Sequence, residues 1–347
     1  MIYFNSDYLE GAHPAIMTRL METNMVQTVG YGEDEYCEDA REKIKSACQA
    51  PEADVHFLVG GTQTNTTVIA AILRPWQGVL SAVSGHINCH EAGAIESTGH
   101  KVITLPTGNG KITAQQVRDY VEWHKNDEST EHIVQPGMVY ISFPTEGGTL
   151  YSKAELTALY DTCKQYGLPL FIDGARLGYG LVAEGNDITL PELARLCDVF
   201  YIGGTKVGAL FGEAVVIMNE ALKKDFRFIM KQRGGRLAKG RLLGIQFDAL
   251  FTDDLYLTIS RHAIDMAYQI REIFVSAGYP LLFDSPTNQQ YPIMPDDELA
   301  EIGKNFGYEY WERTDPTHSG VRFCASWATT QENVDALRAA VQALQKK

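Results

Sequence analysis

The stretch Asp198-Val199-Phe200-Tyr201-Ile202-Gly203-Gly204-Thr205-Lys206 places a single lysine just after an apolar, strand-like run. The two glycines allow the backbone to turn sharply and allow a large group to approach. Lysine is rare at the end of a core strand unless its ammonium group has a task. Partial burial would lower the pKa of Lys206 and let its amine attack a carbonyl group, whereas the commoner alternative is a lysine that begins a surface loop.

Strand-like and helix-like segments alternate around this stretch. Alternation over about 200 residues predicts a mainly parallel sheet covered by helices on both faces, in the α/β class. The expected strands span residues 55–59, 78–83, 101–105, 138–143, 168–173, 199–202 and 213–218. The expected helices span residues 14–23, 35–50, 68–73, 86–97, 112–125, 153–165 and 190–196, and residues 1–11 are expected to form an extended arm.

The pattern changes after residue 240. One long helix is expected first, then short strands and a final helix, which is typical of a small α+β domain. These elements span residues 242–277, 281–283, 290–295, 321–326 and 331–346. We therefore expect a large domain over residues 1–240, including the N-terminal arm, and a smaller one over residues 241–347.

The composition narrows the classes of function. The chain has 347 residues, of which 45% are hydrophobic and 21% charged, as in an ordinary globular protein with a full core. A formal net charge of -14 argues against a nucleic-acid partner, because nothing offsets phosphate repulsion. Six scattered cysteines without a CxxC pair favour reduced thiols in a cytoplasmic enzyme. We expect no signal peptide and no membrane span, since no basic-then-apolar start or long apolar run is found.

A candidate anion site follows the expected strand 55–59. The sequence Gly60-Gly61-Thr62-Gln63-Thr64-Asn65 lies between that strand and a helix. Free amides at a helix N-terminus bind anions, and threonine hydroxyls add donors. The alternative is a glycine turn with a threonine cap. The stretch matches neither the Walker sequence nor GxGxxG.

Asp173 ends the apolar run Leu168–Ile172 and is followed closely by Arg176. The carboxyl edge of an open α/β sheet is where such folds bind ligands. Burial would raise the pKa of Asp173 unless a cation faces it, and a protonated pyridine nitrogen is such a cation. Arg176 could hold a carboxylate in a bidentate fork. The alternatives are an aspartate that caps the next turn and a surface arginine.

His86 and His90 are four residues apart and could lie on one side of a helix. A zinc pair is a weak interpretation, because HExxH is absent and no third ligand is evident, so no metal is predicted. An imidazole stacked on an aromatic ligand fits better. The alternative is one core histidine and one exposed histidine.

Together these stretches point to pyridoxal 5'-phosphate. A helix start would hold its phosphate, a strand-end carboxylate would keep its pyridine nitrogen protonated, and a lysine would form the Schiff base. Each signal is weak alone, but their order and their positions at strand ends make the set specific.

Nearly the whole chain resembles the low-specificity L-threonine aldolases, in the β-eliminating-lyase group of fold-type-I pyridoxal phosphate enzymes. The matching motifs are Asn5-Ser6-Asp7, Tyr31-Gly32-Glu33-Asp34, Gly61-Thr62-Gln63-Thr64-Asn65, His86 with Glu91-Ala92-Gly93, Asp173-Gly174-Ala175-Arg176, Thr205-Lys206 and Arg322.

The resemblance implies roles for matching residues. Lys206 would carry the cofactor, Asp173 would face its pyridine nitrogen, and His86 would stack on its ring. The phosphate ligands would be Gly61, Thr62 and Thr205, and Arg176 would also contact the cofactor. The substrate carboxylate would be held by Ser6, Arg176 and Arg322. The resemblance also implies a homodimer or homotetramer.

Two stretches depart from the family pattern. Its Glu-Asn-Thr-His-Asn is replaced by Ser142-Phe143-Pro144-Thr145-Glu146-Gly147-Gly148, and its Gly-Gly-Gly-Met-Arg-Gln by residues 233–240. These changes favour a divergent, phenylserine-aldolase-like subgroup. The cation that reaches the phosphate could be Arg233, Arg236 or Lys239.

The implied reaction is retro-aldol cleavage of a β-hydroxy-α-amino acid, such as L-threonine, L-allo-threonine or phenylserine, to glycine and an aldehyde. His86 is the leading candidate for the base, alone or through a water, and His90 is the reserve. The alternatives are β-elimination or transamination on the same scaffold, or a pyridoxal phosphate-binding protein without turnover.

Overall fold

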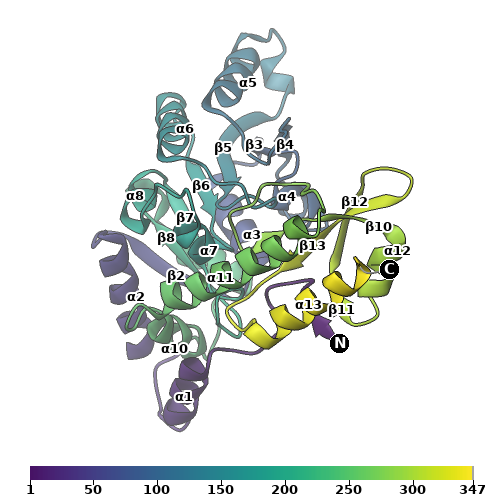
Figure 1. Cartoon of the computed structure of the whole chain (residues 1–347). Helices are drawn as coiled ribbons and strands as arrows, with labels where there is room; N and C mark the ends of the chain where they lie inside the picture. Colours follow the sequence, from purple (N-terminus) through teal and green to yellow (C-terminus); the bar gives the residue numbers. More distant parts are fainter. Residues whose placement is uncertain (346–347) are drawn as a thin grey trace.

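A seven-stranded sheet forms the centre of the larger part of this computed structural model, which describes residues 1–345 (Figure 1). The strand order is β2-β8-β7-β6-β5-β3-β4, and only β8 runs antiparallel to its neighbours. The strands are β2 (Asp54–Leu58), β3 (Gln77–Ala82), β4 (Val102–Leu105), β5 (Gln135–Ser142), β6 (Leu170–Asp173), β7 (Val199–Gly203) and β8 (Glu213–Ile217). The predicted mainly parallel sheet is confirmed.

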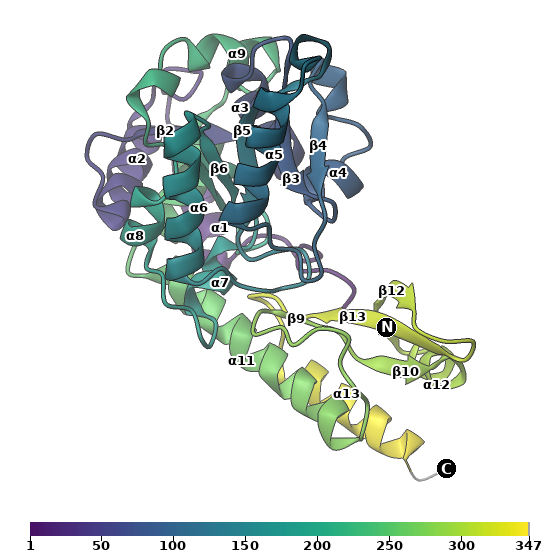
Figure 2. The same ribbon diagram turned by 90° about the horizontal axis from the view of Figure 1, so that it is seen from above.

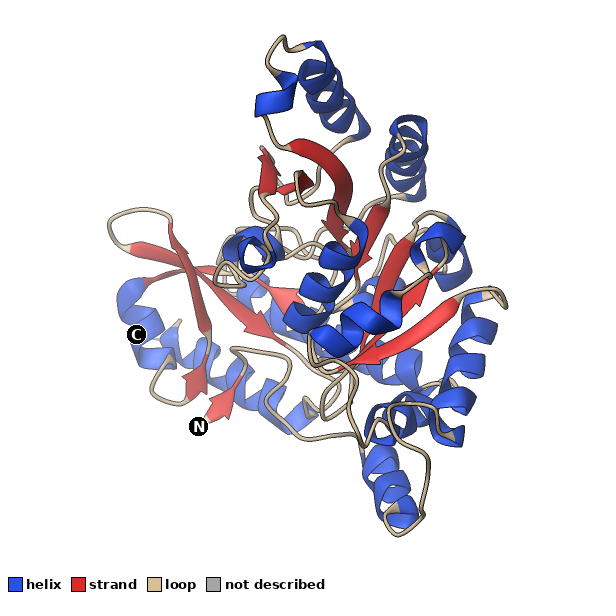
Figure 3. Ribbon diagram, turned by 180° about the vertical axis from the view of Figure 1, so that it is seen from behind, coloured by secondary structure: helices blue, strands red, loops and turns tan. Residues whose placement is uncertain are grey.

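Helices cover both faces of this sheet, as Figure 3 shows from behind. Successive residues of one strand, such as Tyr140 and Ile141, point to opposite faces of the sheet and enter two different hydrophobic cores. The helices are α1 (Pro14–Thr23), α2 (Glu35–Cys48), α3 (Gly61–Ile72), α4 (His86–Cys89), α5 (Ala114–Asn126), α6 (Lys153–Tyr166), α7 (Leu177–Val182), α8 (Leu190–Arg195), α9 (Phe226–Gln232) and α10 (Arg241–Leu250). Short 3-10 turns are η1 (Glu96–Thr98), η2 (Thr130–His132) and η3 (Glu220–Leu222).

The C-terminal part builds a second, smaller core around β13 and α11, set to one side of the large sheet in Figure 2. Strand β13 pairs with β9, β10 and β12, all antiparallel. The N-terminal β1 (Ile2–Tyr3) pairs with β11, so the arm joins this part. The remaining elements are α11 (Leu255–Ser276), β9 (Gln289–Gln290), β10 (Ile293–Pro295), α12 (Asp296–Ile302), β11 (Phe306–Gly307), β12 (Glu309–Arg313), β13 (His318–Cys324) and α13 (Gln331–Leu344).

Two predicted helices are wrong in extent. The helix expected over 86–97 is α4, which ends at Cys89, followed by the 3-10 turn η1; Ala92 and Gly93, with positive φ angles of 49° and 73°, lie between the two and prevent one continuous helix. The helix expected over 242–277 is α10 and α11, separated where Asp253 and Asp254 have φ of 52° and 56°. Positive φ ends a right-handed helix because L residues rarely continue from it.

Other boundaries also differ. Helix α3 begins at Gly61, seven residues before the expected start at residue 68, since its threonines are tolerated in a helix that packs on the sheet. The strand expected over 281–283 is a single bridge between Leu281 and Pro292, and residues 290–295 divide between β9 and β10. The helix expected over residues 331–346 is α13, which ends at Leu344. Residue 346 lies outside the described residues. Within residues 1–345 no helix is long and apolar enough to cross a bilayer.

Candidate active site

The parallel strands of the large sheet end along one edge, and the predicted site residues follow these ends. The register aligns Leu58 of β2 with Glu213 of β8, and Glu213 with Gly203 of β7. The starts of α3 and of the Lys206 turn therefore lie at the same edge, on either side of Glu213. The segments that follow strand ends there are Gly60–Thr62 after β2, His86 after β3, Glu146 after β5, Asp173 at the end of β6 and Thr205–Lys206 after β7.

Glycines fix the turn that carries Lys206. A side chain at Gly203 would place Cβ 2.3 Å from the Ala175 carbonyl oxygen, so no larger residue fits. The amides of Gly204 and Thr205 donate to the Gly212 carbonyl at 2.9 and 3.2 Å. The Lys206 carbonyl accepts a 2.6 Å hydrogen bond from the Tyr179 hydroxyl. The turn thus holds the backbone of Lys206 on both sides.

The environment of Lys206 favours its neutral amine. Burial lowers its pKa most, and the nearby Arg176 guanidinium lowers it further. The carboxylates of Asp7, Asp173 and Glu213 act in the opposite direction, but the net shift is downward. In the described chain its Nζ has no hydrogen-bond partner. A neutral, unpaired amine is what nucleophilic attack on a carbonyl requires.

Asp173 is buried between two tyrosines of the neighbouring strands. The hydroxyls of Tyr140 and Tyr201 donate to its two oxygens at 2.6 and 2.5 Å, and the Ala175 amide donates at 3.0 Å. Burial acts to raise its pKa, but the charge of His86 and these hydrogen bonds lower it overall. Asp173 is therefore an anion in a low-dielectric setting, which suits a cationic pyridine nitrogen.

A hydrogen-bond chain joins Asp173 to His86. Asn65 Nδ2 donates to Asp173 Oδ2 at 3.1 Å and to Glu91 Oε1 at 2.7 Å. The same Glu91 oxygen lies 2.8 Å from His86 Nδ1. Buried Glu91 thus orients the His86 ring, whose side chain remains 34% exposed. His90 lies 5.6 Å from that ring, and burial, then His86, lower its pKa.

These polar partners were not predicted as site residues. Asn65 and Glu91 lie in quoted motifs but were assigned no role, and Tyr140 and Tyr201 were read as core. The signal was available, because a tyrosine in a buried strand needs a partner for its hydroxyl.

The start of α3 can hold an anion. Its N-cap, Gly60, supplies no side-chain bond, so the first-turn amides stay available. A Cβ at Gly61 would lie 3.2 Å from the Tyr201 hydroxyl, which places this helix start beside the Asp173 group. Thr62 is exposed at the same turn. Gly61 and Thr62 therefore lie where a cofactor phosphate could reach them.

Thr205, the third predicted phosphate ligand, is already engaged. Its hydroxyl donates to Glu213 Oε1 at 2.8 Å and accepts from the Gly212 amide at 3.0 Å. Burial raises the pKa of Glu213 to about 8, against the Thr205 hydrogen bond and the Lys206 charge, which lower it. Only a remaining lone pair of Thr205 is free, so direct donation to a phosphate would require Thr205 to leave Glu213.

Among the three cations considered for the phosphate, the geometry favours Arg233. Gln63 of α3 donates from Nε2 to the Arg233 carbonyl at 3.2 Å, so this turn lies beside the helix start. Among the described residues, the Nε atoms of both Arg233 and Arg236 are buried without a partner, so only the position of Arg233 beside α3 separates the two. Arg236 instead lies 3.5 Å from Glu33 and over the Tyr31 ring, and Lys239 is exposed.

Arg176 differs from its prediction. Its Nε and Nη2 donate to the two oxygens of Asp7 at 2.6 and 3.0 Å, so the expected bidentate fork is occupied by a residue of the chain itself. Burial raises the pKa of Asp7, but Arg176 and then Lys206 bring it down to about 2. The two N–H groups of Nη1 and the second N–H of Nη2 are left to meet a substrate. The missed residue is Asp7, although it belongs to a quoted motif.

Arg322 and Ser6 meet at the N-terminal arm. Arg322 Nη2 donates to the Asn5 carbonyl at 3.0 Å, and Nη1 donates to Gln289 Oε1 at 3.2 Å. Its guanidinium carbon lies 5.6 Å from the centre of the Trp311 ring, and its Nε is buried with no partner within residues 1–345. Ser6 is buried between Asn5 and Asp7. Their roles toward a substrate carboxylate stay predictions.

A cavity of about 400 Å³ brings the central groups together. It is lined by Lys206, His86, His90, Arg176, Arg322 and Glu146, and by aromatic residues Tyr8, Tyr310 and Trp311. Its lining does not include Gly61, Thr62, Asp173 or Thr205, which lie around or beneath it. No group of three metal-binding side chains is found within residues 1–345.

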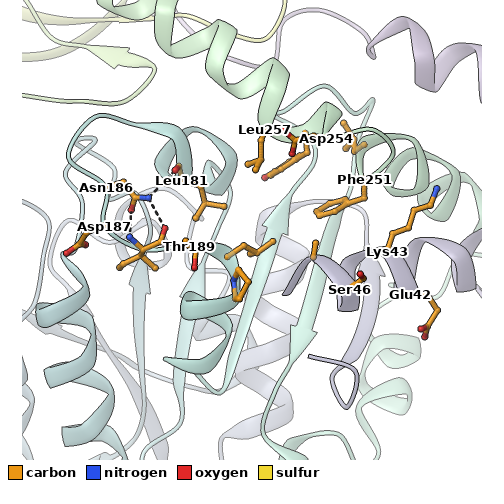
Figure 4. A pocket seen from close by; sticks show the side chains of 16 residues that line it. Glu42, Lys43, Ser46, Leu181, Asn186, Asp187, Thr189, Phe251, Asp254 and Leu257 are labelled. Carbon is orange, nitrogen blue, oxygen red and sulfur yellow. Dashed lines mark hydrogen bonds between the residues drawn. The ribbon is translucent and has the colours of Figure 1, made fainter. Parts of the chain in front are cut away.

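A larger cavity of about 1040 Å³ lies elsewhere, between α2, α8 and the α10–α11 junction (Figure 4). Leu181, Phe251 and Leu257 line it, and none of the predicted site residues do. Size alone would therefore select the wrong cavity, and the chemistry selects the smaller one.

The family model for beta-eliminating lyases matches residues 4–343. The chain belongs to this family. A solved threonine aldolase structure from Leishmania major superposes with a TM-score of 0.96 at 42% identity, covering 99% of this chain and 100% of that one. A low specificity L-threonine aldolase from Pseudomonas aeruginosa is 29% identical over 334 residues, which is 95% of this chain and 94% of the relative.

A more distant structure shares the fold alone. An aspartate aminotransferase from Thermus thermophilus has a TM-score of 0.72 at 15% identity, covering 100% of this chain and 91% of that one. The family and these neighbours are pyridoxal phosphate enzymes, so the predicted fold-type-I class, cofactor and lyase class are confirmed. The roles of individual residues stay predictions.

Proposed function

We propose that this lyase cleaves a β-hydroxy-α-amino acid of the threonine, allo-threonine or phenylserine type into glycine and an aldehyde. The observation that carries the proposal is the Lys206 amine, which is unpaired among the described residues and whose pKa burial lowers, in one cavity with His86 and Arg322. The relatives named threonine aldolases support the same reaction. The aromatic lining of the cavity, from Tyr8, Tyr310 and Trp311, is compatible with a phenyl substituent at Cβ.

The residues present fit pyridoxal 5'-phosphate. Lys206 would hold its aldehyde carbon, Asp173 its pyridine nitrogen, and the α3 start with Arg233 its phosphate. The bound group supplies an electron sink for charge that develops at Cα. Asp173 remains ionised because Tyr140 and Tyr201 donate to both its oxygens.

The chain's own residues would orient the substrate. Arg322, which is fixed by Asn5 and Gln289, offers a cation for the substrate carboxylate. Holding the carboxylate fixes which bond to Cα would lie perpendicular to the plane of the cofactor ring. That bond is the one that breaks. The His86 ring, which is oriented by Glu91, lines the cavity.

The test is cleavage by the purified protein with added pyridoxal phosphate. L-threonine, L-allo-threonine and phenylserine are supplied in turn, and glycine and aldehyde are assayed together with Lys206→Ala as the control. Equal amounts of glycine and aldehyde, absent in the control, are expected. Ammonia release, or a requirement for an amino-group acceptor, would instead indicate β-elimination or transamination.

We also propose a cytoplasmic homodimer or homotetramer with two domains, 1–240 and 241–347. All six cysteines are free, and all but Cys89 are buried, as in a reducing compartment. Exposed Met21, Met25 and Phe228 offer apolar surface for a second subunit.

The two-domain division is supported by the separate core of the C-terminal part, although α10 packs in the larger core.

A further inference from the structure

Glu146 is an acidic side chain at the candidate active site that has no assigned role. It follows β5 and lines the cavity that contains Lys206, His86 and Arg322. Its Oε1 accepts hydrogen bonds from the His86 amide at 2.8 Å and from the Ser142 hydroxyl at 2.7 Å. In the described chain its Oε2 has no partner. One oxygen is therefore fixed, and the other is free to accept a proton.

The backbone of Glu146 is held as firmly as its side chain. Its carbonyl accepts hydrogen bonds from the Tyr291 hydroxyl at 2.8 Å and from Gln289 Nε2 at 3.4 Å. Gln289 also accepts from Arg322 Nη1 at 3.2 Å. Gln289 thus contacts both Glu146 and Arg322, the arginine expected to hold the substrate carboxylate. One side chain therefore positions both groups.

The surroundings raise the pKa of the Glu146 carboxyl group. Burial raises its pKa most, the Ser142 hydrogen bond lowers it, and the Asp173 charge raises it again, with a net upward shift. The charged or titratable groups that share its cavity are Lys206, Arg176, Arg322, His86, His90, Glu309, Tyr8 and Tyr310. A raised pKa makes the carboxylate a better proton acceptor than an ordinary glutamate.

His86 is less suited to that task. Its Nδ1 is bound to Glu91, and a ring that stacks on a planar cofactor directs its face, not its nitrogen, toward the ligand. His90 has a lowered pKa and no hydrogen bond that fixes its ring among the described residues. Glu146 lines the cavity, its Oε1 is fixed by two hydrogen bonds, and its Oε2 has no partner among the described residues.

We infer that Glu146 is the catalytic base that accepts the β-hydroxyl proton of the substrate, an inference that rests on the proposed cleavage. Oε2 takes the proton, and the O–H electron pair forms the carbonyl of the aldehyde. The Cα–Cβ bond breaks, and its electron pair stays on Cα until a proton from water completes glycine. Glu146 then returns its proton to water. Atoms and electrons balance without a further reactant.

The test separates cleavage from the chemistry that precedes it. Wild type, Glu146→Gln and Lys206→Ala are assayed for cleavage of phenylserine and for exchange of the glycine Cα hydrogen in D2O, followed by proton NMR. Exchange needs Lys206 and the cofactor but no β-hydroxyl group. Gln keeps an oxygen acceptor for the His86 amide, so the local structure is preserved. Visible absorbance of the bound cofactor gives a readout besides activity.

The expected result is a selective loss. Glu146→Gln should lower kcat for cleavage by about 100-fold or more, with glycine exchange and cofactor absorbance within about threefold of wild type. Glu309→Gln, which removes another carboxylate of the same cavity, should leave the ratio of cleavage to exchange unchanged. In wild type kcat/KM should rise with pH as Glu146 loses its proton, and this rise should be absent in Glu146→Gln.

Three results would overturn the inference. Cleavage by Glu146→Gln at near wild-type rate would remove Glu146 from the reaction. An equal fall of cleavage and exchange in Glu146→Gln would show a structural role. If wild type exchanges glycine but releases no aldehyde from any β-hydroxy amino acid, the proposed function itself fails, and the inference fails with it.

Discussion

The buried pair of Asp7 and Arg176 is the strongest residue-scale constraint on the site. It joins the N-terminal arm to the turn after β6, and Asn288 also donates to Asp7 at 2.9 Å. Breaking one side of a buried ion pair leaves an uncompensated charge. We expect Asp7→Asn to lower the free energy of unfolding by about 3–5 kcal/mol, measured by urea denaturation. Asp39→Asn, at an exposed position of α2, is the matched control, and equal stability of the two variants would contradict this.

The Asp7–Arg176 pair also makes the free energy of unfolding depend on pH. The pKa of Asp7 is about 2 in the folded protein, below its usual 3.8. A depressed carboxyl pKa adds stability that is complete above the unfolded pKa and is lost as pH falls through the folded pKa. Wild type should lose about 2 kcal/mol from this group between pH 4 and pH 2, and Asp7→Asn should not. Parallel stability curves for the two proteins would exclude this contribution.

His86 is expected to act chiefly through contact with the cofactor ring. In His86→Asn we expect the dissociation constant of pyridoxal phosphate to rise about 3- to 10-fold, as for loss of one aromatic contact, measured by absorbance titration. Cleavage should be slower, while the rise of kcat/KM with pH assigned to Glu146 persists. An unchanged rate and affinity would remove His86 from the site. Loss of the pH dependence would return the base to His86.

The sequence predicted which residues lie at the site better than it predicted the contacts that those residues make. Lys206, His86 and Arg322 line one cavity, and Asp173 ends β6 as expected. The occupied fork of Arg176 and the engaged hydroxyl of Thr205 were not foreseeable, because their partners, Asp7 and Glu213, come from distant or unassigned segments. Glu146 was missed because a lone glutamate in a loop carries no periodic or motif signal.

At the scale of elements, the turn after β7 depends on a glycine. A Cβ at Gly203 would lie 2.3 Å from the oxygen and 2.6 Å from the carbon of the Ala175 carbonyl, so backbone must move. We expect Gly203→Ala to lower the free energy of unfolding of the cofactor-free protein by about 3 kcal/mol.

The control for that turn is Gly108→Ala. Nothing lies within 4 Å of a Cβ at Gly108, so its stability should change by no more than about 0.5 kcal/mol. Thermal unfolding of both variants provides the measurement. A Gly203→Ala protein as stable as Gly108→Ala would mean that the close approach to Ala175 does not constrain the turn.

The regular elements of the large sheet were predicted well, since buried strands are continuous apolar runs bounded by turn signals. The elements that were missed are short or exposed. Strand β12 (Glu309–Arg313) is mostly exposed and charged, and β1 and β11 are two residues each, so pairing rather than sequence defines them. The break between α10 and α11 was missed because two aspartates can continue a helix pattern.

At the scale of the whole molecule, exposed apolar side chains point to self-association. Met25 is 88% exposed and Phe228 is 76% exposed. We expect the double variant Met25→Glu and Phe228→Glu to shift the protein toward monomer in sedimentation velocity. Val275→Glu, at an exposed apolar position of α11, is the control and should keep the wild-type mass. A monomeric wild type, or a double variant of unchanged mass, would contradict the proposed assembly.

The most direct test of the central claim is to locate the lysine that carries the cofactor. The protein is incubated with pyridoxal phosphate, reduced with borohydride, digested and mapped by mass spectrometry. The expected result is one phosphopyridoxyl group on the peptide that contains Lys206, abolished in Lys206→Ala. A stoichiometric label on another lysine, or the same labelling in the variant, would contradict the assignment of this site.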